Sequence, residues 1–160
     1  MQKKLLAKDI MSEQVLMVYE GWSISRLAEF FSKHDISGAP VIASDHSLVG
    51  VVSSSDIVRF EGADLEKKSA WIEEVYTEYL GHHYDQNTRK ELSKKAAEFC
   101  TVNQIMTPNV IQVDAQTPLS ELAYTMLQSN VRRVFVTKQG IIRGVVSTKN
   151  ILQALTYQDL

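Results

Sequence analysis

The sequence lacks the features of several large classes of protein. Its one cysteine, Cys100, excludes an intramolecular disulfide framework. No apolar run approaches the roughly 20 residues of a membrane-spanning helix, and the start, Met1-Gln2-Lys3-Lys4, lacks the apolar run of a signal peptide. We therefore expect a cytoplasmic protein that does not bind membranes.

The chain also lacks an excess of charge of either sign. It has 17 Lys and Arg against 19 Asp and Glu, which leaves a formal net charge of -2. Nucleic acids and anionic membranes select strongly basic surfaces, so neither is expected as the main partner. Any bound anion must be held by a local group of basic residues.

Recognisable catalytic and metal-binding motifs are missing as well. No serine-histidine-acid set, no pair of acid and base carboxylates and no phosphate loop of the Walker type can be assembled. His82 and His83 adjoin Tyr84 and Asp85, but neighbouring side chains point apart and no third ligand stands at metal spacing, so a solvated turn is favoured over a zinc site. Cys100 has no nearby histidine base and is expected to be a packing residue. We expect no enzyme activity, no metal and no required cofactor.

What the chain does contain is a tandem repeat, within 160 residues of which 44% are hydrophobic. Leu48-Val49-Gly50-Val51-Val52-Ser53-Ser54-Ser55-Asp56-Ile57 returns as Ile142-Arg143-Gly144-Val145-Val146-Ser147-Thr148-Lys149-Asn150-Ile151. Each copy is an apolar strand that passes through a glycine into a serine, before Asp or Asn opens a new apolar run. Such a junction starts a helix, where side chains cap the first turn and backbone N–H groups can hold an anion.

The first copy predicts the element order β-α-β-β-α. A lead-in of about one helical turn precedes a strand over 15–19, and Ser23 is placed to cap a helix with apolar residues at helical spacing. Strands over 38–42 and 48–52 follow, joined by a polar loop, and the last helix begins near Ser54.

The second copy repeats this pattern, with residue numbers higher by 95, as in Ile10 and Ile105, and by 94 after a one-residue deletion near Gly140. Thr117-Pro118 predicts a helix start with the hydroxyl as cap and proline as the first helical residue. The domain boundaries that follow are 1–61 for the first repeat, 62–101 for an intervening segment and 102–160 for the second repeat.

The intervening segment, 62–101, which we call the insert, has no strand pattern and predicts two helices. One carries an apolar face that ends near Gly81, and Thr88 has capping-box spacing ahead of the other. The face comprises Ile72, Val75, Tyr76 and Tyr79. Aromatic residues at helical spacing are usually buried, which favours a helical hairpin docked beside the repeats. Alternatively, Trp71, Tyr76, Tyr79 and Tyr84 form a contact surface for a protein partner.

These residues carry a resemblance to a known family. The openings Asp9-Ile10-Met11-Ser12 and Gln104-Ile105-Met106-Thr107-Pro108, with the two glycine-to-serine closings, resemble a tandem pair of CBS domains, known as a Bateman module. The resemblance covers about 5–60 and 102–157 and leaves the insert unexplained. It implies a mixed α/β (α+β) fold in which the two repeats pack sheet to sheet with pseudo-two-fold symmetry. It also implies a homodimer, and adenosyl ligands such as AMP, ADP or ATP, with S-adenosylmethionine or NAD as further possibilities.

The resemblance also implies a set of ligand-binding residues. Asp56 matches the position that accepts hydrogen bonds from the ribose hydroxyls, with Ser53 and Ser55 beside it and Val51 against the purine. In the second copy Ser147 matches Ser53, and Asn150 replaces the aspartate, so this half loses the charge of the ribose acceptor.

The basic pair Arg132-Arg133 and Lys149 match phosphate-contacting positions, whereas the first copy has Ser37-Gly38 in place of the arginines. We therefore expect one good site that combines Asp56 with these three basic residues. The alternative is that Asp56 only caps a helix and the arginines lie in solvent.

Two functions follow from these expectations. The first is a regulatory sensor that binds an adenine nucleotide and acts on an unknown effector protein. The alternative is a ligand-free dimerisation or scaffold module that recruits a protein partner through the insert. For both we expect a homodimer, because Ile57-Val58 and Ile151-Leu152-Leu155 place apolar side chains that a monomer would have difficulty covering.

Overall fold

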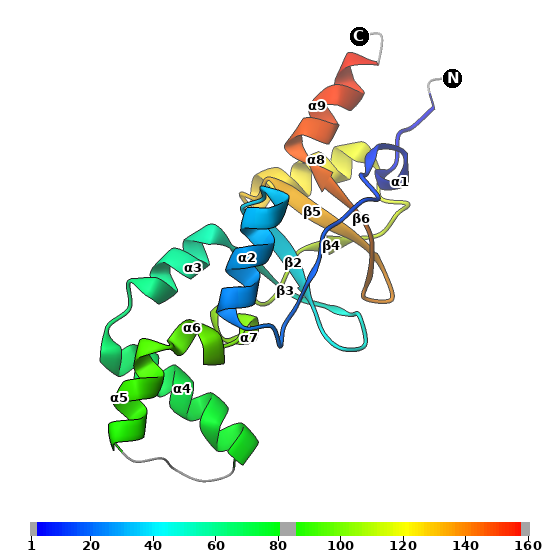
Figure 1. Ribbon diagram of the computed structural model, residues 1–160. Helices are drawn as coiled ribbons and strands as arrows, with labels where there is room; N and C mark the ends of the chain where they lie inside the picture. Colours follow the sequence, from blue (N-terminus) through cyan, green and yellow to red (C-terminus); the bar gives the residue numbers. More distant parts are fainter. Residues whose placement is uncertain (1–2, 81–85, 158–160) are drawn as a thin grey trace. The chain divides into compact units, whose positions relative to one another are not determined.

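The computed structural model describes residues 3–80 and 86–157, which form two compact units. Met17–Ser44 and Val49–Pro108 make up one, which we call the first-repeat unit. The described residues of Met1–Leu16, Asp45–Leu48 and Asn109–Leu160 make up the other, the second-repeat unit. Each repeat supplies one three-stranded sheet, and Figure 1 labels the elements in chain order.

The sheet of the first repeat has the strand order β1-β2-β3. Its elements are β1 (Val18–Tyr19), α2 (Ile24–His34), β2 (Gly38–Ile42), β3 (Leu48–Ser53) and α3 (Ser54–Glu61). β1 and β2 run parallel, so α2 provides the crossover that such a pair requires. Ser23 caps α2 by accepting the N–H of Arg26 at 3.1 Å. The predicted order β-α-β-β-α and the predicted cap are confirmed.

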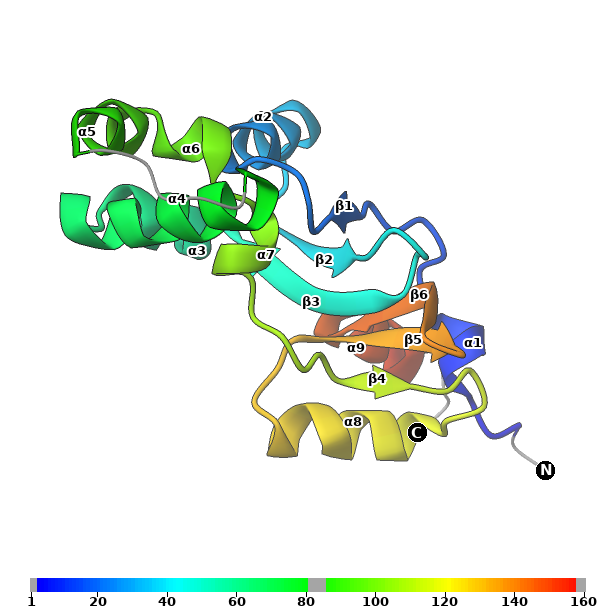
Figure 2. The ribbon, with the colours of Figure 1, turned by 90° about the horizontal axis from the view of Figure 1, so that it is seen from below.

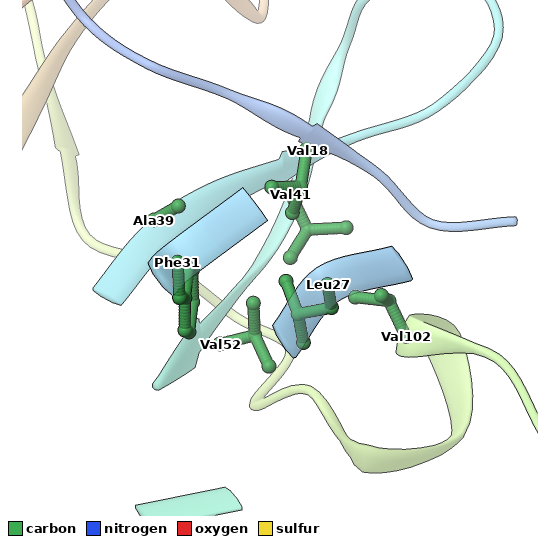
Figure 3. Packing of buried hydrophobic residues seen from close by; sticks show 7 residues of the cluster. All are labelled: Val18, Leu27, Phe31, Ala39, Val41, Val52 and Val102. Atoms are coloured by element: carbon green, nitrogen blue, oxygen red, sulfur yellow. The ribbon is translucent and has the colours of Figure 1, made fainter. Parts of the chain in front are cut away.

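The core of the first-repeat unit lies between α2 and its sheet. Leu27 and Phe31, four residues apart on α2, point toward the strand residues Val41 and Val52 (Figure 3). Leu27 and Val41 have no exposed surface. Complete burial of a side chain of this size contributes roughly 1.5–3 kcal/mol, so this packing fixes which face of α2 meets the sheet.

The second repeat builds the same arrangement. Its elements are β4 (Gln112–Val113), α8 (Leu119–Gln128), β5 (Arg133–Lys138), β6 (Ile141–Ser147) and α9 (Thr148–Thr156). β4 runs parallel to β5, and β5 runs antiparallel to β6. Leu122 and Met126 of α8 pack against Val134, Val136 and Val146 of the strands. The two repeats therefore use equivalent apolar positions for equivalent cores.

Each compact unit also contains the short opening helix of the other repeat. α1 (Ala7–Ile10) lies in the second-repeat unit, where the Ala7 N–H donates to Thr117 O at 2.8 Å and Ala7 is fully buried. α7 (Val102–Ile105) lies in the first-repeat unit, where the Val102 N–H donates to Trp22 O at 2.9 Å. The compact units are thus not the same as the two stretches of repeated sequence.

The insert folds onto the first-repeat unit. It contains α4 (Leu65–Leu80), α5 (Gln86–Lys94) and α6 (Ala96–Phe99). α6 packs beside α2, α4 lies next to α3, and α5 packs on α4 and α6 (Figure 2). A second apolar cluster joins these helices to α2 and α3; its buried members are Ile24, Phe60, Ile72, Ala96 and Cys100. The two buried hydroxyls of Ser69 and Ser93 lie 2.8 Å apart, hydrogen-bonded between α4 and α5. The buried side of α4 therefore packs against other helices of the first-repeat unit.

Some predicted boundaries are wrong. β1 is shorter than 15–19, and Pro118 itself is the residue before α8, with ψ 149°, so Thr117 neither caps the helix nor precedes a first helical proline. Thr88 lies inside α5, which includes Gln86, and the helical part of the insert has three described segments where two were predicted. The predictions for Gly81, His82, His83, Tyr84 and Asp85 fall outside the described residues.

Candidate functional site

Asp56 caps α3 with a buried carboxylate. Its Oδ2 accepts hydrogen bonds from the Ser53 N–H at 2.8 Å and the Ser53 hydroxyl at 3.2 Å, and only 6% of the residue is exposed. Its Oδ1 forms an ion pair with Arg59, one turn further along the helix, whose side chain is exposed. The capping role foreseen as an alternative is therefore real, and it fixes the orientation of the carboxylate.

Asn150 occupies the equivalent position at the start of α9. Its Oδ1 accepts the Ser147 N–H at 2.8 Å and the Ser147 hydroxyl at 2.9 Å. Both repeats thus build the same cap with an oxygen acceptor. They differ in charge, because an amide replaces the carboxylate, and Gln153 stands where the first repeat has Arg59.

The segment after α7 crosses β3 next to the Asp56 cap. Val51 and Thr107 exchange both backbone hydrogen bonds, at 2.9 and 2.8 Å. A Cβ on Gly50 would lie 2.6 Å from Met106 Sδ and 2.9 Å from Thr107 O, so this close crossing requires glycine. Val51 is half-buried beneath the crossing, and Ser55, in the first turn of α3, is exposed.

The second-repeat unit contains the matching crossing. Ser12 pairs with Val145, and a Cβ on Gly144 would lie 2.6 Å from Met11 Sδ. In each unit, therefore, a strand, a capped helix start and a crossing segment meet at one place. The repetition of this junction makes it the candidate functional site of each unit.

The second-repeat junction is basic. Arg132 O accepts the Thr148 N–H at 3.0 Å, and Arg133 lies opposite Ser147 in the β5–β6 ladder. Both arginines and Lys149, in the first turn of α9, are exposed. Guanidinium groups, an ammonium group and the amide end of a helix all favour an anion.

The first-repeat junction has the same backbone contact without the basic side chains. The Ser54 N–H donates to Ser37 O at 2.9 Å, in the place of the contact between Thr148 and Arg132. The structure therefore gathers Val51, Ser53, Ser55 and Asp56 at one junction, and Arg132, Arg133, Ser147, Lys149 and Asn150 at the other. The first presents hydroxyls and a carboxylate that is ion-paired with Arg59, and the second presents three cations without a carboxylate at the cap.

Sequence reasoning missed three residues of the first junction. The Arg59 ion pair could have been inferred from its (i, i+3) spacing to Asp56 on a helix. Met106 and Thr107 belong to the other repeat in sequence, and no local pattern reveals that they cross β3. Gly50 itself was the available signal in the sequence, since a glycine inside a strand often marks a place where another backbone approaches closely.

The thiol of Cys100 is buried in the cluster that joins the insert to α2 and α3. Burial raises the pKa of the Cys100 thiol to about 11, with a smaller contribution from the charge of Glu74, so the thiol stays protonated near neutral pH. Over 3–80 and 86–157, no three His, Cys, Asp or Glu side chains are grouped to hold a metal ion. In the same ranges no helix has the length and apolarity needed to cross a bilayer.

Comparison with known proteins places the chain in a family. The CBS domain family matches it twice, over residues 7–62 and 102–157, and leaves most of the insert outside both matches. A protein of Methanocaldococcus jannaschii, the uncharacterized protein MJ1426, is 29% identical over 168 residues, covering 94% of this chain and 91% of that protein.

Solved structures show the same fold. The chain resembles CBSX2 of Arabidopsis thaliana, solved in complex with AMP, with a TM-score of 0.66 at 23% identity over 94% of this chain and 96% of that chain. It also resembles the CBS domain pair of protein MJ0100, solved with 5'-methylthioadenosine and S-adenosyl-L-methionine, with a TM-score of 0.63 at 24% identity over 96% and 98%. The chain therefore belongs to the CBS domain family, and its two repeats form a tandem CBS pair.

Proposed function

We propose that this chain is a regulatory module that binds an adenine nucleotide and transmits its occupancy to an effector protein. The observation that carries the proposal is the difference in charge between two junctions of the same construction. Asp56 stands at one, and Arg132, Arg133 and Lys149 stand at the other. A nucleotide has ribose hydroxyls that donate and phosphates that accept, so it matches both sets. The AMP and S-adenosyl-L-methionine complexes of similar structures support an adenosyl ligand.

The Asp56 carboxylate is suited to a ribose. An ionised carboxylate only accepts hydrogen bonds. The two neighbouring hydroxyls of a ribose can each donate one, so a carboxylate can accept from both. Oδ2 already accepts two bonds from Ser53, so the ligand must use Oδ1, where Arg59 now lies. Because the Arg59 side chain is exposed, it can leave Oδ1 at low cost. The proposal therefore includes displacement of Arg59 by the ribose.

The basic set is suited to phosphate. Two arginines provide forked donors for oxyanions, and Lys149 adds a point charge in the first turn of α9. The proposal therefore assigns Asp56 to ribose and this basic set to phosphate. The proposal assigns no catalytic step to the chain.

A melting experiment tests ligand binding directly. Ligands that bind only the folded chain stabilise it, by roughly 2.7 kcal/mol at about 100 times the dissociation constant, which corresponds to on the order of 5 °C for a chain of this size. AMP, ADP, ATP, S-adenosylmethionine and NAD are each added at millimolar concentration, with inorganic phosphate as the control for a simple anion effect. A shift with at least one adenosyl ligand and none with phosphate is expected.

The second candidate function, a dimerisation or scaffold module, is favoured by the exposed apolar residues of two helices. Tyr124 and Leu127 of α8 are 65% and 79% exposed, and Leu152 and Leu155 of α9 are 59% and 40% exposed. Ile151 is half-buried in the core, so it contributes less to this face than predicted. No melting shift with any ligand would favour this function over the sensor.

We propose a homodimer under either function, because a second copy of the chain would bury these exposed apolar residues of α8 and α9. Light scattering at micromolar concentration should give about twice the chain mass of 18.1 kDa. The variant Leu127→Glu, which places a charge at the most exposed of the four α8 and α9 positions, should shift the mass toward 18.1 kDa. A wild-type mass equal to that of the single chain would refute the dimer.

A further inference from the structure

Trp71 of the insert touches both elements that build the first junction. Its ring stacks on Phe60 of α3, with ring centroids 5.1 Å apart and planes at 28°. Its backbone oxygen accepts a hydrogen bond from Gln104 Nε2 of α7 at 2.9 Å. Figure 2 shows α4 next to α3 and α7. One residue of α4 thus fixes α3 and α7 relative to each other.

α3 and α7 both connect to the candidate ligand-binding residues of the first junction. Phe60 lies one helical turn after Asp56 on α3 and is 1% exposed. Lys68 of α4 donates to Glu61 O at 2.9 Å and so holds the last turn of the same helix. α7 continues into Thr107, which pairs with Val51. A displacement of the insert would therefore act on both sides of the junction.

Two isoleucines extend this connection into the protein core. Ile57 follows Asp56, and Ile105 precedes Met106, and each packs against both the sheet core and the core of the insert. Protein interiors are close-packed, so a change on one side of such a residue is felt on the other. The packing of the insert and the geometry of the junction are not independent.

Gln104 is the residue that distinguishes this arrangement from the second-repeat unit. Asp9, its equivalent, accepts the Leu6 N–H at 2.9 Å, and Gln104 Oε1 accepts the Thr101 N–H at 3.0 Å in the same way. Only the amide has N–H groups to donate, and Gln104 uses one of them for Trp71 O. The side chain therefore retains the cap and adds a link to the insert.

We propose that Gln104 and Trp71 are positioning residues through which the docked insert holds the adenosyl-binding junction in its binding geometry. Ligand binding and insert docking are then coupled, so that ligand tightens the insert and undocking weakens the ligand. This inference rests on the proposed adenosyl site and assigns the insert a role in regulating it.

The variant Gln104→Glu separates the two functions of the side chain. It keeps an acceptor for the Thr101 N–H, removes the donor to Trp71 O, and places a negative charge near Glu74, whose Oε2 lies 3.5 Å from Gln104 Nε2. Asp9→Asn is the matched control, because it keeps the cap acceptor in the unit that lacks the insert. Hydrogen–deuterium exchange of α4 and α6, with β2 as internal reference, and calorimetric titration with the best adenosyl ligand are measured together.

We expect exchange in α4 and α6 of Gln104→Glu to accelerate about fivefold relative to β2, as the loss of one hydrogen bond implies. The ligand dissociation constant should rise by a similar factor, and ligand should slow exchange of the wild-type insert. Asp9→Asn should change neither quantity. Faster insert exchange with an unchanged dissociation constant would overturn the coupling, because a purely structural link would give that result.

Hydrogen–deuterium exchange without ligand tests the link between the junction and the insert even if no adenosyl ligand binds. Ser53→Ala removes the hydroxyl that donates to Asp56 Oδ2, and Ser147→Ala makes the same change in the other unit. Coupling predicts that Ser53→Ala alone accelerates exchange in α4 and α6 beyond any change in β2. Equal acceleration in β2 and the insert, or none in the insert, would refute it. An absence of ligand binding would instead refute the proposed function.

Discussion

At Asp56 one carboxylate caps a helix and supplies the proposed ribose acceptor, and Asp56→Asn separates these roles. Asparagine can still accept both bonds from Ser53, as Asn150 does from Ser147, so the free energy of unfolding should change by less than about 1 kcal/mol. Loss of charge should weaken adenosine binding roughly tenfold, the difference between a charged and a neutral acceptor. Calorimetry and urea unfolding measure the two effects. Unchanged affinity would remove Asp56 from the site.

Arg133→Ala tests whether the basic set contacts phosphate. The guanidinium fork stabilises an oxyanion, so the variant should bind AMP about tenfold more weakly and adenosine as well as the wild type does. Arg143, which lies on β6 and is exposed, provides the control for a general loss of positive charge. The assignment fails if Arg133→Ala and Arg143→Ala weaken AMP binding equally.

Cys100 makes the stability of the fold depend on pH in the alkaline range. Burial raises the pKa of its thiol to about 11 from an ordinary value of 9.0, so the folded chain holds this proton more tightly than the unfolded chain. The resulting stability is complete below pH 9 and is lost as pH rises through 11. Urea unfolding between these pH values should show a steeper decline in the wild type than in Cys100→Ala. Equal declines would contradict the burial of the thiol.

Sequence reasoning predicted the side chains of each junction more completely than their contacts. The repeated junction singled out Asp56 as a helix-start residue, because a cap and its helix are local in sequence, and the resemblance to the CBS family implied its ribose role. The Arg59 ion pair was not predicted, although it occupies the Asp56 oxygen that the proposed ribose contact requires. The contact between Val51 and Thr107 joins residues far apart in the chain, and periodicity carries no information about such a pair.

At the scale of elements, Gly50 allows the segment after α7 to cross β3. Gly50→Ala would place a methyl group 2.9 Å from Thr107 O, and the backbone there is fixed by its pairing with Val51. We expect a loss of about 1–3 kcal/mol in unfolding free energy. Gly21→Ala is the control, since nothing lies within 4 Å of its added carbon. If the two variants unfold at the same denaturant concentration, the crossing does not depend on glycine.

The elements themselves were predicted where a periodic apolar pattern extends over a whole helix or strand. α2, β2 and β3 follow their patterns, and Ser23 caps α2 as expected. Thr117-Pro118 was misassigned because proline suits the residue before a helix as well as its first position, and here ψ of 149° places it before α8. The apolar face predicted for the insert favoured docking beside the repeats, but the sequence could not name its partners in α2, such as Ile24, which are distant in the chain.

At the scale of the whole molecule, the two repeats have diverged in chemistry while keeping one construction. Phe60 is buried against the insert, whereas its counterpart Ala154 is a small buried residue. The junction with Asp56 and the insert belong to the first-repeat unit, whereas Arg132, Arg133 and Lys149 belong to the second-repeat unit. The connection to the insert is therefore a property of the first-repeat unit.

Native mass spectrometry of the purified chain tests the central claim, that the tandem pair binds an adenosyl ligand through Asp56. Wild type and Asp56→Asn are each sprayed with AMP, ADP, ATP, S-adenosylmethionine and NAD at equal concentration in competition. The account predicts that the wild type retains one adenosyl ligand preferentially and that Asp56→Asn retains several-fold less of it. Wild type without any retained ligand, or equal retention by the two proteins, would contradict it.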